Sequence, residues 1–251
     1  RSLMEAGLDV ARINFSHGTH AQHAVTIANI RMLSKDLRRP VAILGDLQGP
    51  RIRIGDLPET LQIAPGQELT FVHETHAKAG DIPVTYDDMA RDVIVGGRIL
   101  VNDGLLEFVV VKIDGERVLV RTVHGGPMKS HKGMNLPGID VSAPSLTEKD
   151  HADIAFAIAQ DLDYLALSFV RRADDLVKLR ALLPKGMLIV SKIEKDSALA
   201  RLEEIVEARD AVMAARGYLG VELPFEGLPL AQKPILGLAT RVGAPCVPAT
   251  P

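Results

Sequence analysis

The feature that most constrains the fold of this chain is an alternation of apolar, strand-like runs with helix-like segments. Apolar runs that alternate with amphipathic helices are typical of a parallel sheet with helices packed outside it. The sequence therefore predicts an α/β protein with six parallel strands. The six runs lie near Val10, Val41, Leu165, Ile189, Val212 and Val247.

Between the second and third runs the periodicity changes. From Ile52 to about Lys132 the apolar runs are short and alternating, and turn residues such as Gly66 and Gly125-Gly126 separate them. Hairpin signals at this spacing favour a small all-β unit, and a segment of about 80 residues is too long for a loop. We therefore predict an inserted β-barrel domain over residues 54–133, and a discontinuous α/β domain made of residues 1–53 and 134–251.

Two architectures fit the strand–helix alternation. A (β/α)8 TIM barrel fits if about six of its eight strands lie here, with one strand before Arg1 and one after Pro251. An open, doubly wound sheet is the alternative, but no glycine-rich phosphate-binding fingerprint follows any predicted strand. We therefore predict an incomplete TIM barrel that carries the inserted β domain. We interpret both ends of the sequence as cuts within a larger protein.

Composition argues against several classes of protein. The 251 residues are 47% hydrophobic and carry a formal net charge of −3, so a large core is possible and no basic surface for nucleic acid is indicated. The single cysteine, Cys246, can form no internal disulfide. No apolar run has the length of a membrane span, and no signal peptide is visible. We expect a cytoplasmic protein that binds neither nucleic acid nor membranes.

The run Leu188–Glu194 ends in two opposite charges. Lys192 and Glu194 are two residues apart in a predicted strand, so both side chains leave the same face, about 7 Å apart along the chain. Burying this pair costs free energy unless something uses the charges. A structural ion pair is one interpretation. The other is a site for phosphoryl or enolate chemistry, with Lys192 facing developing negative charge and Glu194 holding a divalent metal.

Polar residues also gather at the carboxyl ends of the other predicted strands, where TIM barrels carry their chemistry. Together, arginines, carboxylates and hydroxyls suit a small, highly anionic substrate with a metal. The residues at these ends are Arg12, Asn14, Ser16, His17, Asp46, Arg51, Arg53, Ser168, Arg171, Lys192, Glu194, Arg216, Gly217 and Thr250.

Seven ordered motifs resemble those of the pyruvate kinase family: VARINFSHG, GDLQGPRIR, KGMNLPG, LTEKD, SFVR, SKIE, and MAARGYLGVELP with LAQK. The resemblance implies a (β/α)8 barrel with a β-barrel lid inserted after its third strand. It also implies phosphoryl transfer from phosphoenolpyruvate to ADP, which gives pyruvate and ATP in the last step of glycolysis. Family chains start earlier and continue through a C-terminal domain, so the full-length protein is expected to be a homotetramer.

The resemblance also implies roles for individual residues. Lys192 and Arg12 match the cations at the phosphate of phosphoenolpyruvate, and Thr250 matches a hydroxyl near the protonation path. Glu194 matches one of two carboxylates that hold Mg2+ or Mn2+. Other matches are the backbone of Ala215, Arg216 and Gly217 for the substrate carboxylate; Asn14, Phe15, Ser16, His17, Arg53 and Lys132 for the nucleotide; and Asn14, Ser16, Asp46 and the Leu47 carbonyl for K+.

The sequence departs from the family pattern after Gly217. Tyr218 stands where the family has its second metal carboxylate, and a phenol is a poor Mg2+ ligand. A catalytically impaired homologue that binds phosphoenolpyruvate or another anion is therefore the alternative function. Pro234 is expected to kink or break a predicted helix. Pro248 lies in a predicted core strand, and Pro251 directly follows Thr250.

Two further expectations concern charge. Arg51 stands where many pyruvate kinases have an acidic residue that accompanies the K+ requirement. Because a basic side chain there is thought to replace the ion, we expect weak or no K+ dependence. An aldolase-like Schiff base on Lys192 is disfavoured because Glu194, two residues away, should keep the amine protonated.

Overall fold

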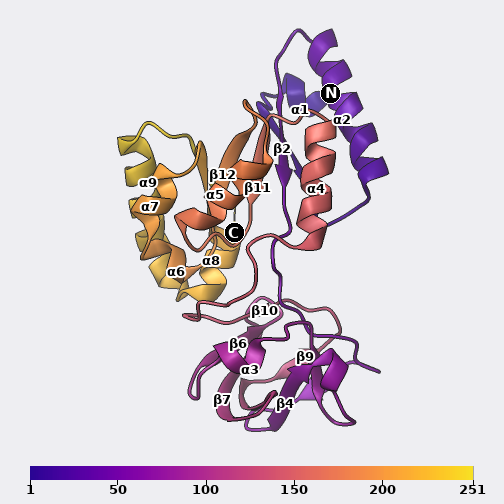
Figure 1. Cartoon of the computed structure of the whole chain (residues 1–251), viewed down its shortest axis with the longest axis vertical. Helices are drawn as coiled ribbons and strands as arrows, with labels where there is room; N and C mark the ends of the chain where they lie inside the picture. The colour runs from indigo at the N-terminus through magenta and orange to yellow at the C-terminus, as the bar shows by residue number, and fades with distance from the viewer. Residues whose placement is uncertain (251) are drawn as a thin grey trace.

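The chain forms two units, which are seen one above the other in a computed structural model (Figure 1). The structure describes residues 1–250, and Pro251 lies outside the described residues. The parallel-sheet unit contains both ends of the described chain and most of the helices. The β unit, below it in Figure 1, is built mainly from the strands between residues 61 and 135.

Six parallel strands form the sheet of the parallel-sheet unit, and they lie side by side in chain order. A doubly wound sheet reverses its strand order at a switch point, whereas this order runs in one direction, as it does in a barrel. The prediction of six strands in part of a (β/α) barrel is therefore confirmed, and the doubly wound alternative is wrong. The strands are β1 (Val10–Asn14), β2 (Ala42–Asp46), β11 (Tyr164–Leu167), β12 (Leu188–Ile193), β13 (Ala211–Ala215) and β14 (Cys246–Ala249).

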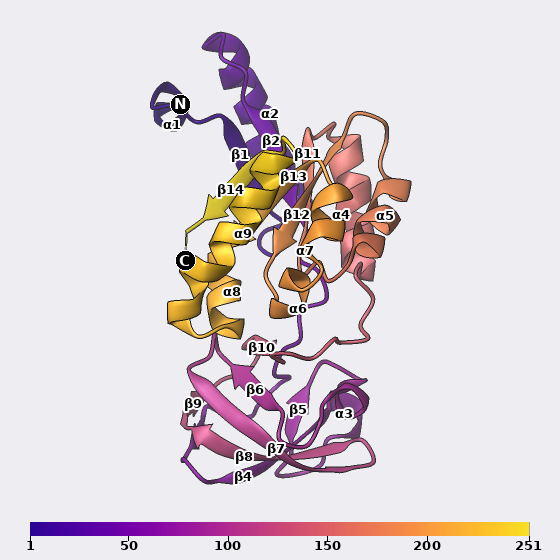
Figure 2. The same ribbon diagram turned by 90° about the vertical axis from the view of Figure 1, so that its left-hand side faces the viewer.

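Helices connect the strands and lie along the sheet, as Figure 2 shows. The N-terminus of α4 (Glu148–Ala159) is fixed by a capping box, in which the Thr147 hydroxyl accepts from the Asp150 N–H and the Asp150 carboxylate accepts from the Thr147 N–H. Two short helices follow β12, α6 (Asp196–Leu199) and α7 (Leu202–Glu207). The other helices are α1 (Ser2–Glu5), α2 (His20–Asp36), α5 (Ala173–Leu182), α8 (Arg216–Glu222), η2 (Phe225–Gly227) and α9 (Leu228–Arg241).

The two prolines near the end of the described chain are accommodated without a break. Of the two outcomes expected for Pro234, a kink or a break, the break is wrong, because α9 continues through it. Pro234 is exposed, so water can satisfy the carbonyl that loses its helical N–H partner. Pro248 lies in β14, which is the last strand of the sheet order rather than a central strand. An edge strand tolerates the missing N–H of a proline.

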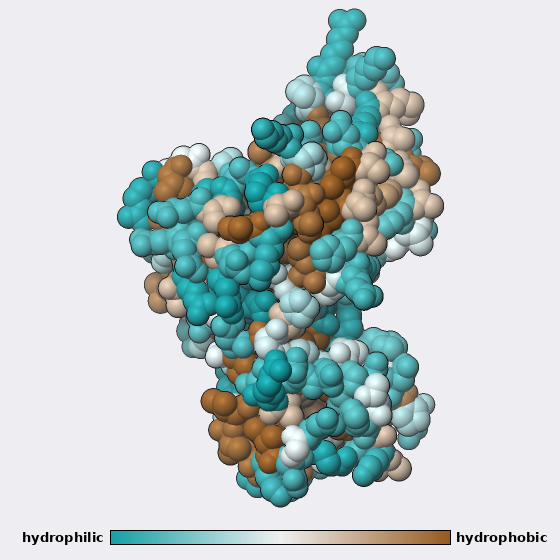
Figure 3. All heavy atoms as spheres, in the orientation of Figure 1, coloured by the Kyte–Doolittle hydropathy of each residue, from teal (hydrophilic) through white to brown (hydrophobic). Residues whose placement is uncertain are grey.

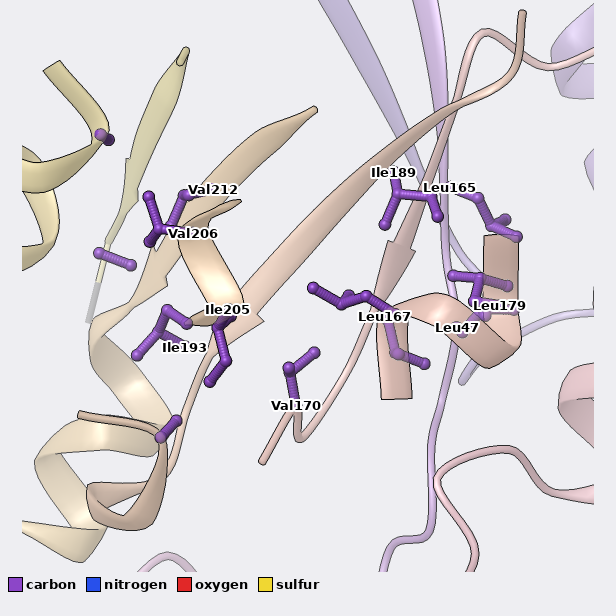
Figure 4. Packing of buried hydrophobic residues seen from close by; sticks show 14 of the residues in the cluster. Leu47, Leu165, Leu167, Val170, Leu179, Ile189, Ile193, Ile205, Val206 and Val212 are labelled. Carbon is purple, nitrogen blue, oxygen red and sulfur yellow. The ribbon is translucent and has the colours of Figure 1, made fainter. Parts of the chain in front are cut away.

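The sheet divides its side chains between two faces because successive residues alternate. One face packs against the helices and forms the larger apolar cluster, part of which appears in Figure 4, including Leu165, Ile189 and Val212. The opposite face carries a small cluster made of Leu44, Ala166, Val190, Ala211 and Met213. Two residues further along β2, β11 and β12, the second face becomes polar, with Asp46, Ser168 and Lys192. Alternation therefore places the polar strand ends on the inner side of the curved sheet.

The β unit has an apolar core of its own, in which the buried rings of Phe71 and Phe108 meet edge to face with centroids 5.2 Å apart. Its main sheet has the order β10-β6-β7-β8-β4-β5 and is mostly antiparallel; β3 and β9 form a second, two-stranded sheet. The bounds are β3 (Leu61–Ile63), β4 (Glu68–His73), η1 (Glu74–His76), β5 (Ile82–Val84), α3 (Met89–Asp92), β6 (Arg98–Val101), β7 (Leu106–Asp114), β8 (Arg117–His124), β9 (Gly126–Met128) and β10 (Met134–Asn135).

The chain passes between the units twice, after β2 and before β11. Arg53 forms an isolated β-bridge with Gly133 at this junction. The core of the β unit also takes in Ile52 on one side and Leu136 to Ala143 on the other. The domain limits at residues 53/54 and 133/134 stay a prediction.

Surface hydropathy is mixed on the face shown in Figure 3, where hydrophobic residues gather on both units. The outermost strands β1 and β14 each expose a valine, Val10 and Val247. Within residues 1–250, none of the helices is both long enough and apolar enough to span a bilayer.

Replacement of the buried Phe108 by Ala tests whether the β unit folds as a separate domain. Loss of this ring should destabilise its surroundings by about 3–5 kcal/mol. We expect faster amide exchange, measured by mass spectrometry, within residues 54–133 only. The matched variant Leu165→Ala removes a fully buried side chain from the other core and should act only on the parallel-sheet unit. Equal loss of protection in both units for either variant would contradict the division.

Candidate active site

The centre of the site is the ammonium of Lys192, which three neighbouring strands surround. Its Nζ lies 3.0 Å from Asp46 Oδ1, at the end of β2, and 2.7 Å from Ser168 Oγ, just after β11. In the parallel register Asp46 is paired with Ala166, and Ala166 with Val190. Asp46 is therefore level with Ala166 and Val190, and Ser168 and Lys192 are the next inward-facing residues on the two adjacent strands. All three side chains are buried.

Glu194 adds a second carboxylate to Lys192. Its Oε1 lies 3.0 Å from Lys192 Nζ, which confirms that the two charges project together. Its Oε2 accepts a hydrogen bond of 2.7 Å from the backbone N–H of Phe169. Phe169 has a φ of +54°, in the left-handed region that bulky residues rarely adopt. This turn points the N–H at the carboxylate, so the chain after β11 is shaped around Glu194.

Charge coupling keeps Lys192 protonated. Burial lowers the pKa of Lys192, but the charges of Glu194 and Asp46 outweigh that effect, so its pKa lies above the ordinary value. Burial raises the pKa of the fully buried Glu194 carboxyl, against the opposing charge of Lys192 and the Phe169 N–H. A protonated Lys192 amine is a poor nucleophile, which agrees with the expectation against Schiff-base chemistry.

Arg12 brings a second cation to the same carboxylate from β1. Its Nε donates to Asp46 Oδ2 over 2.6 Å, and its side chain is 51% exposed. Asp46 therefore lies between one buried cation and one accessible cation. Both cations line a small polar cavity at this end of the sheet. The lining residues are Arg12, Asn14, Ser16, His17, Asp46, Gln48, Arg51, Ser168, Phe169, Lys192 and Tyr218.

Tyr218 packs within an aromatic and cationic group beside the cavity. Its ring meets Phe169 edge to face with centroids 5.5 Å apart, and the Arg51 guanidinium carbon lies 5.4 Å from its ring centroid. A cation over an aromatic face is attracted by the ring. Burial, followed by the nearby charge of Arg51, lowers the pKa of Arg53 from its ordinary value. The site therefore concentrates positive charge next to Tyr218.

The donors for a divalent cation are few. Glu194 Oε1 is buried and lies 3.0 Å from Lys192 Nζ, so a metal ion bound there would share this oxygen with the ammonium. Both Asp46 oxygens are paired with cations, and Tyr218 offers only a phenol. One carboxylate fits an Mg2+ or Mn2+ ion whose other ligands are phosphate oxygens and waters. It does not fit an ion held by protein side chains alone.

Three of the four groups expected to bind K+, those of Asn14, Asp46 and Leu47, already have partners within the chain. Asn14 Oδ1 accepts from the Ser16 N–H over 3.1 Å, and the Leu47 carbonyl accepts from the Ser168 hydroxyl over 2.6 Å. Asp46 is paired with Lys192 and Arg12. A K+ ion would compete with these donors, which favours the expectation of weak K+ dependence.

The residues predicted to bind the substrate carboxylate and to lie near the protonation path are not all at the Lys192 cavity. Ala215 is buried at the start of α8, and the Arg216 Nε donates to the Ala249 carbonyl over 2.6 Å. Gly217 lines a neighbouring hollow with Tyr218. Thr250 is exposed at the end of β14 and, in the part of the chain that the structure describes, does not line the Lys192 cavity.

The nucleotide positions are also divided. His17, Asn14 and Ser16 line the cavity, whereas the Phe15 ring is buried, 2% exposed, in the core. Arg53 Nη1 donates to the His131 carbonyl at the junction of the units, and the Lys132 carbonyl accepts from the Ile54 N–H.

Sequence reasoning missed two lining residues and misplaced another. Gln48 and Phe169 line the cavity. Phe169 contributes its backbone N–H, and the type of a residue does not predict which backbone N–H groups face a site. Arg171 was expected at the charged rim, but its side chain is buried and donates to the carbonyls of Val141 and Ala143. Arg171 therefore anchors the connection from the β unit.

Comparison with known proteins identifies the class of this site. The family model described as "Pyruvate kinase, barrel domain" matches residues 1–251. A pyruvate kinase of Geobacillus stearothermophilus is 43% identical over 256 residues, which cover 99% of this chain and 44% of the relative. A pyruvate kinase of Mycobacterium tuberculosis is 41% identical over 100% of the chain and 54% of the relative. "Pyruvate kinase PKLR" of Rattus norvegicus is 40% identical over 100% and 46%, respectively.

These similarities identify a family of phosphotransferases that contain a barrel domain. The chain belongs to the pyruvate kinase family. It spans about half the length of the curated relatives it matches.

Removing the ammonium at the centre should destabilise the parallel-sheet unit. In Lys192→Met the buried Asp46 and Glu194 lose their shared cation, and we expect a loss of about 3–5 kcal/mol in urea unfolding. The control is Lys178→Met, which removes an exposed ion pair with Asp174 and should cost less than about 1 kcal/mol. Similar losses for the two variants would contradict the role of Lys192 in joining the strands.

Proposed function

We propose that this chain is the catalytic part of a pyruvate kinase, which transfers a phosphoryl group from phosphoenolpyruvate to ADP. The observation that carries the proposal is the buried Lys192 ammonium, held by Asp46, Ser168 and Glu194 next to the accessible Arg12. Phosphoryl transfer depends on positioning and charge neutralisation rather than on covalent catalysis by the protein. Lys192 and Arg12, two cations at one polar cavity, can position the substrate and neutralise its charge.

The proposed roles follow from where each charge lies. Arg12 binds the phosphate of phosphoenolpyruvate, and Lys192 stabilises charge on the transferring phosphoryl group and on the enolate oxygen that it leaves. The backbone N–H groups of Ala215, Arg216 and Gly217 receive the substrate carboxylate. The enolate then takes a proton at its terminal carbon to give pyruvate, with Thr250 near that path.

The nucleotide is proposed to approach from the side of the β unit. Its contacts are Asn14, Phe15, Ser16 and His17 after β1, with Arg53 and Lys132 at the junction of the units. A divalent cation, when bound, supplies neutralisation of phosphate charge, and Glu194 would hold it through Oε1. We also propose a cytoplasmic, homotetrameric full-length protein in which K+ is dispensable.

Tyr218 favours a second candidate function. With Glu194 as the one carboxylate proposed to hold the metal, the protein would bind phosphoenolpyruvate or another small anion through Arg12 and Lys192 while transferring phosphoryl groups slowly. The packing of Tyr218 on Phe169 and under Arg51 supports this candidate, because the phenol ring lies beside the Lys192 cavity without adding a carboxylate. The two candidates differ in turnover, not in anion binding.

Tyr218→Asp separates the two candidates. A second carboxylate should raise Mn2+ affinity at least about tenfold, measured from free Mn2+ by electron paramagnetic resonance, and Tyr218→Phe should leave it unchanged. Pyruvate formation by the complete gene product is measured in parallel. Turnover by the unaltered protein close to that of Tyr218→Asp supports the kinase. Turnover only in Tyr218→Asp supports the anion-binding homologue, and turnover in neither overturns the kinase proposal.

The Arg51 cation should make monovalent cations unnecessary. We expect equal phosphoenolpyruvate affinity in Na+ and K+, because an internal cation already balances the charge near the cavity. Arg51→Glu should create a preference for K+ of at least about tenfold, whereas Arg51→Lys should not. A protein that binds phosphoenolpyruvate only in K+ would contradict this expectation.

A further inference from the structure

A group of metal-binding side chains lies in the β unit, apart from the Lys192 cavity. His73, His76 and Asp87 each offer one ligand atom, and these three atoms all lie within 4.8 Å of one another. His73 is the last residue of β4, and His76 is the last residue of the short helix η1 that follows. Residues three apart in a 3₁₀ turn lie one above the other. The local backbone therefore brings the two imidazoles together.

Strand pairing brings Asp87 to the two histidines. β5 runs parallel to β4 with His73 opposite Val84, so the chain after β5 leaves the sheet next to His73. Asp87 Oδ1 lies 3.7 Å from His73 Nδ1. The group therefore unites the ends of two paired strands.

A second carboxylate lies at the open side of the group. Glu116 Oε2 is 3.5 Å from His76 Nδ1 and comes from the turn between β7 and β8. The cluster thus offers two imidazoles and two carboxylates. Zn2+ is bound by these ligand types, usually four at a time in a tetrahedron.

The group needs only a small closure to hold an ion. Ligand atoms of a tetrahedral zinc site lie roughly 3.3 Å apart when each is about 2.0–2.1 Å from the metal. His76 and Asp87 have exposed side chains, which can turn without unpacking the core, whereas His73 is only 18% exposed and gives a fixed point. The Thr75 hydroxyl lies 2.8 Å from His73 Nδ1, the ring nitrogen that also faces Asp87, so an ion bound at Nδ1 would displace this hydrogen bond.

We propose that His73, His76 and Asp87, with Glu116 or water as the fourth ligand, form a binding site for Zn2+ or a similar transition-metal ion. Imidazole nitrogens select such ions over Mg2+, which prefers oxygen. The site therefore differs in ion preference from the proposed Glu194 position. A bound ion would join the β4–η1 corner to the segment before α3.

The test is a calorimetric titration of the chelator-treated chain with ZnCl2, followed by competition with excess Mg2+. We expect one Zn2+ per chain at this site, not displaced by Mg2+. His76→Gln and Asp87→Asn should each weaken binding at least about tenfold. Both residues are exposed, so the folded state should survive, and far-ultraviolet circular dichroism checks this.

The matched control is His124→Gln, which removes another exposed histidine of the β unit paired with a carboxylate, Glu107. Zinc affinity should not change in this variant. The proposal is overturned if the chain binds no Zn2+, if Mg2+ displaces it, or if His76→Gln and His124→Gln weaken binding equally.

Discussion

The structure of the site depends on one buried ammonium. Lys192 is buried, yet it stays charged because Asp46, Ser168 and Glu194 surround it. A charge in this position is costly unless its partners are held in place, and here they come from three adjacent strands and one turn. Three features position the partners of Lys192. They are the curvature of the sheet, the register of β2 and β11, and the left-handed backbone at Phe169. The site is therefore built before any ligand arrives.

A fixed cation of this kind suits phosphoryl chemistry because little reorganisation is needed when charge develops. The departure at Tyr218 acts on a different part of the site. In the proposed function it leaves Lys192, Arg12 and Asp46 unchanged, and Glu194 is the one carboxylate proposed for a divalent ion. Arg51 adds charge on the same side.

The sequence was informative where periodicity and residue type decide the outcome. Alternation placed the strands and put Lys192 and Glu194 on one face. Backbone effects were not predictable from residue type: Phe169 adopts a positive φ and provides an N–H to Glu194. Arg171 has the sequence position expected of a cation at the rim of the site. Its side chain instead donates to a carbonyl of a segment that is distant in the sequence. Local helix propensity does not predict the break between α6 and α7 or the continuity of α9 at Pro234. Both depend on tertiary packing and on solvent exposure.

The central claim is that Lys192 and Arg12 together receive the phosphoryl group of phosphoenolpyruvate. The most direct measurement is a crystal structure of the chain with phosphoenolpyruvate bound. We predict a phosphate oxygen within hydrogen-bond distance of Lys192 Nζ and another at the Arg12 guanidinium, with the Asp46 and Ser168 contacts of Lys192 preserved. A phosphate bound elsewhere, with Lys192 still enclosed by Asp46, Ser168 and Glu194 and making no contact with it, would contradict the account.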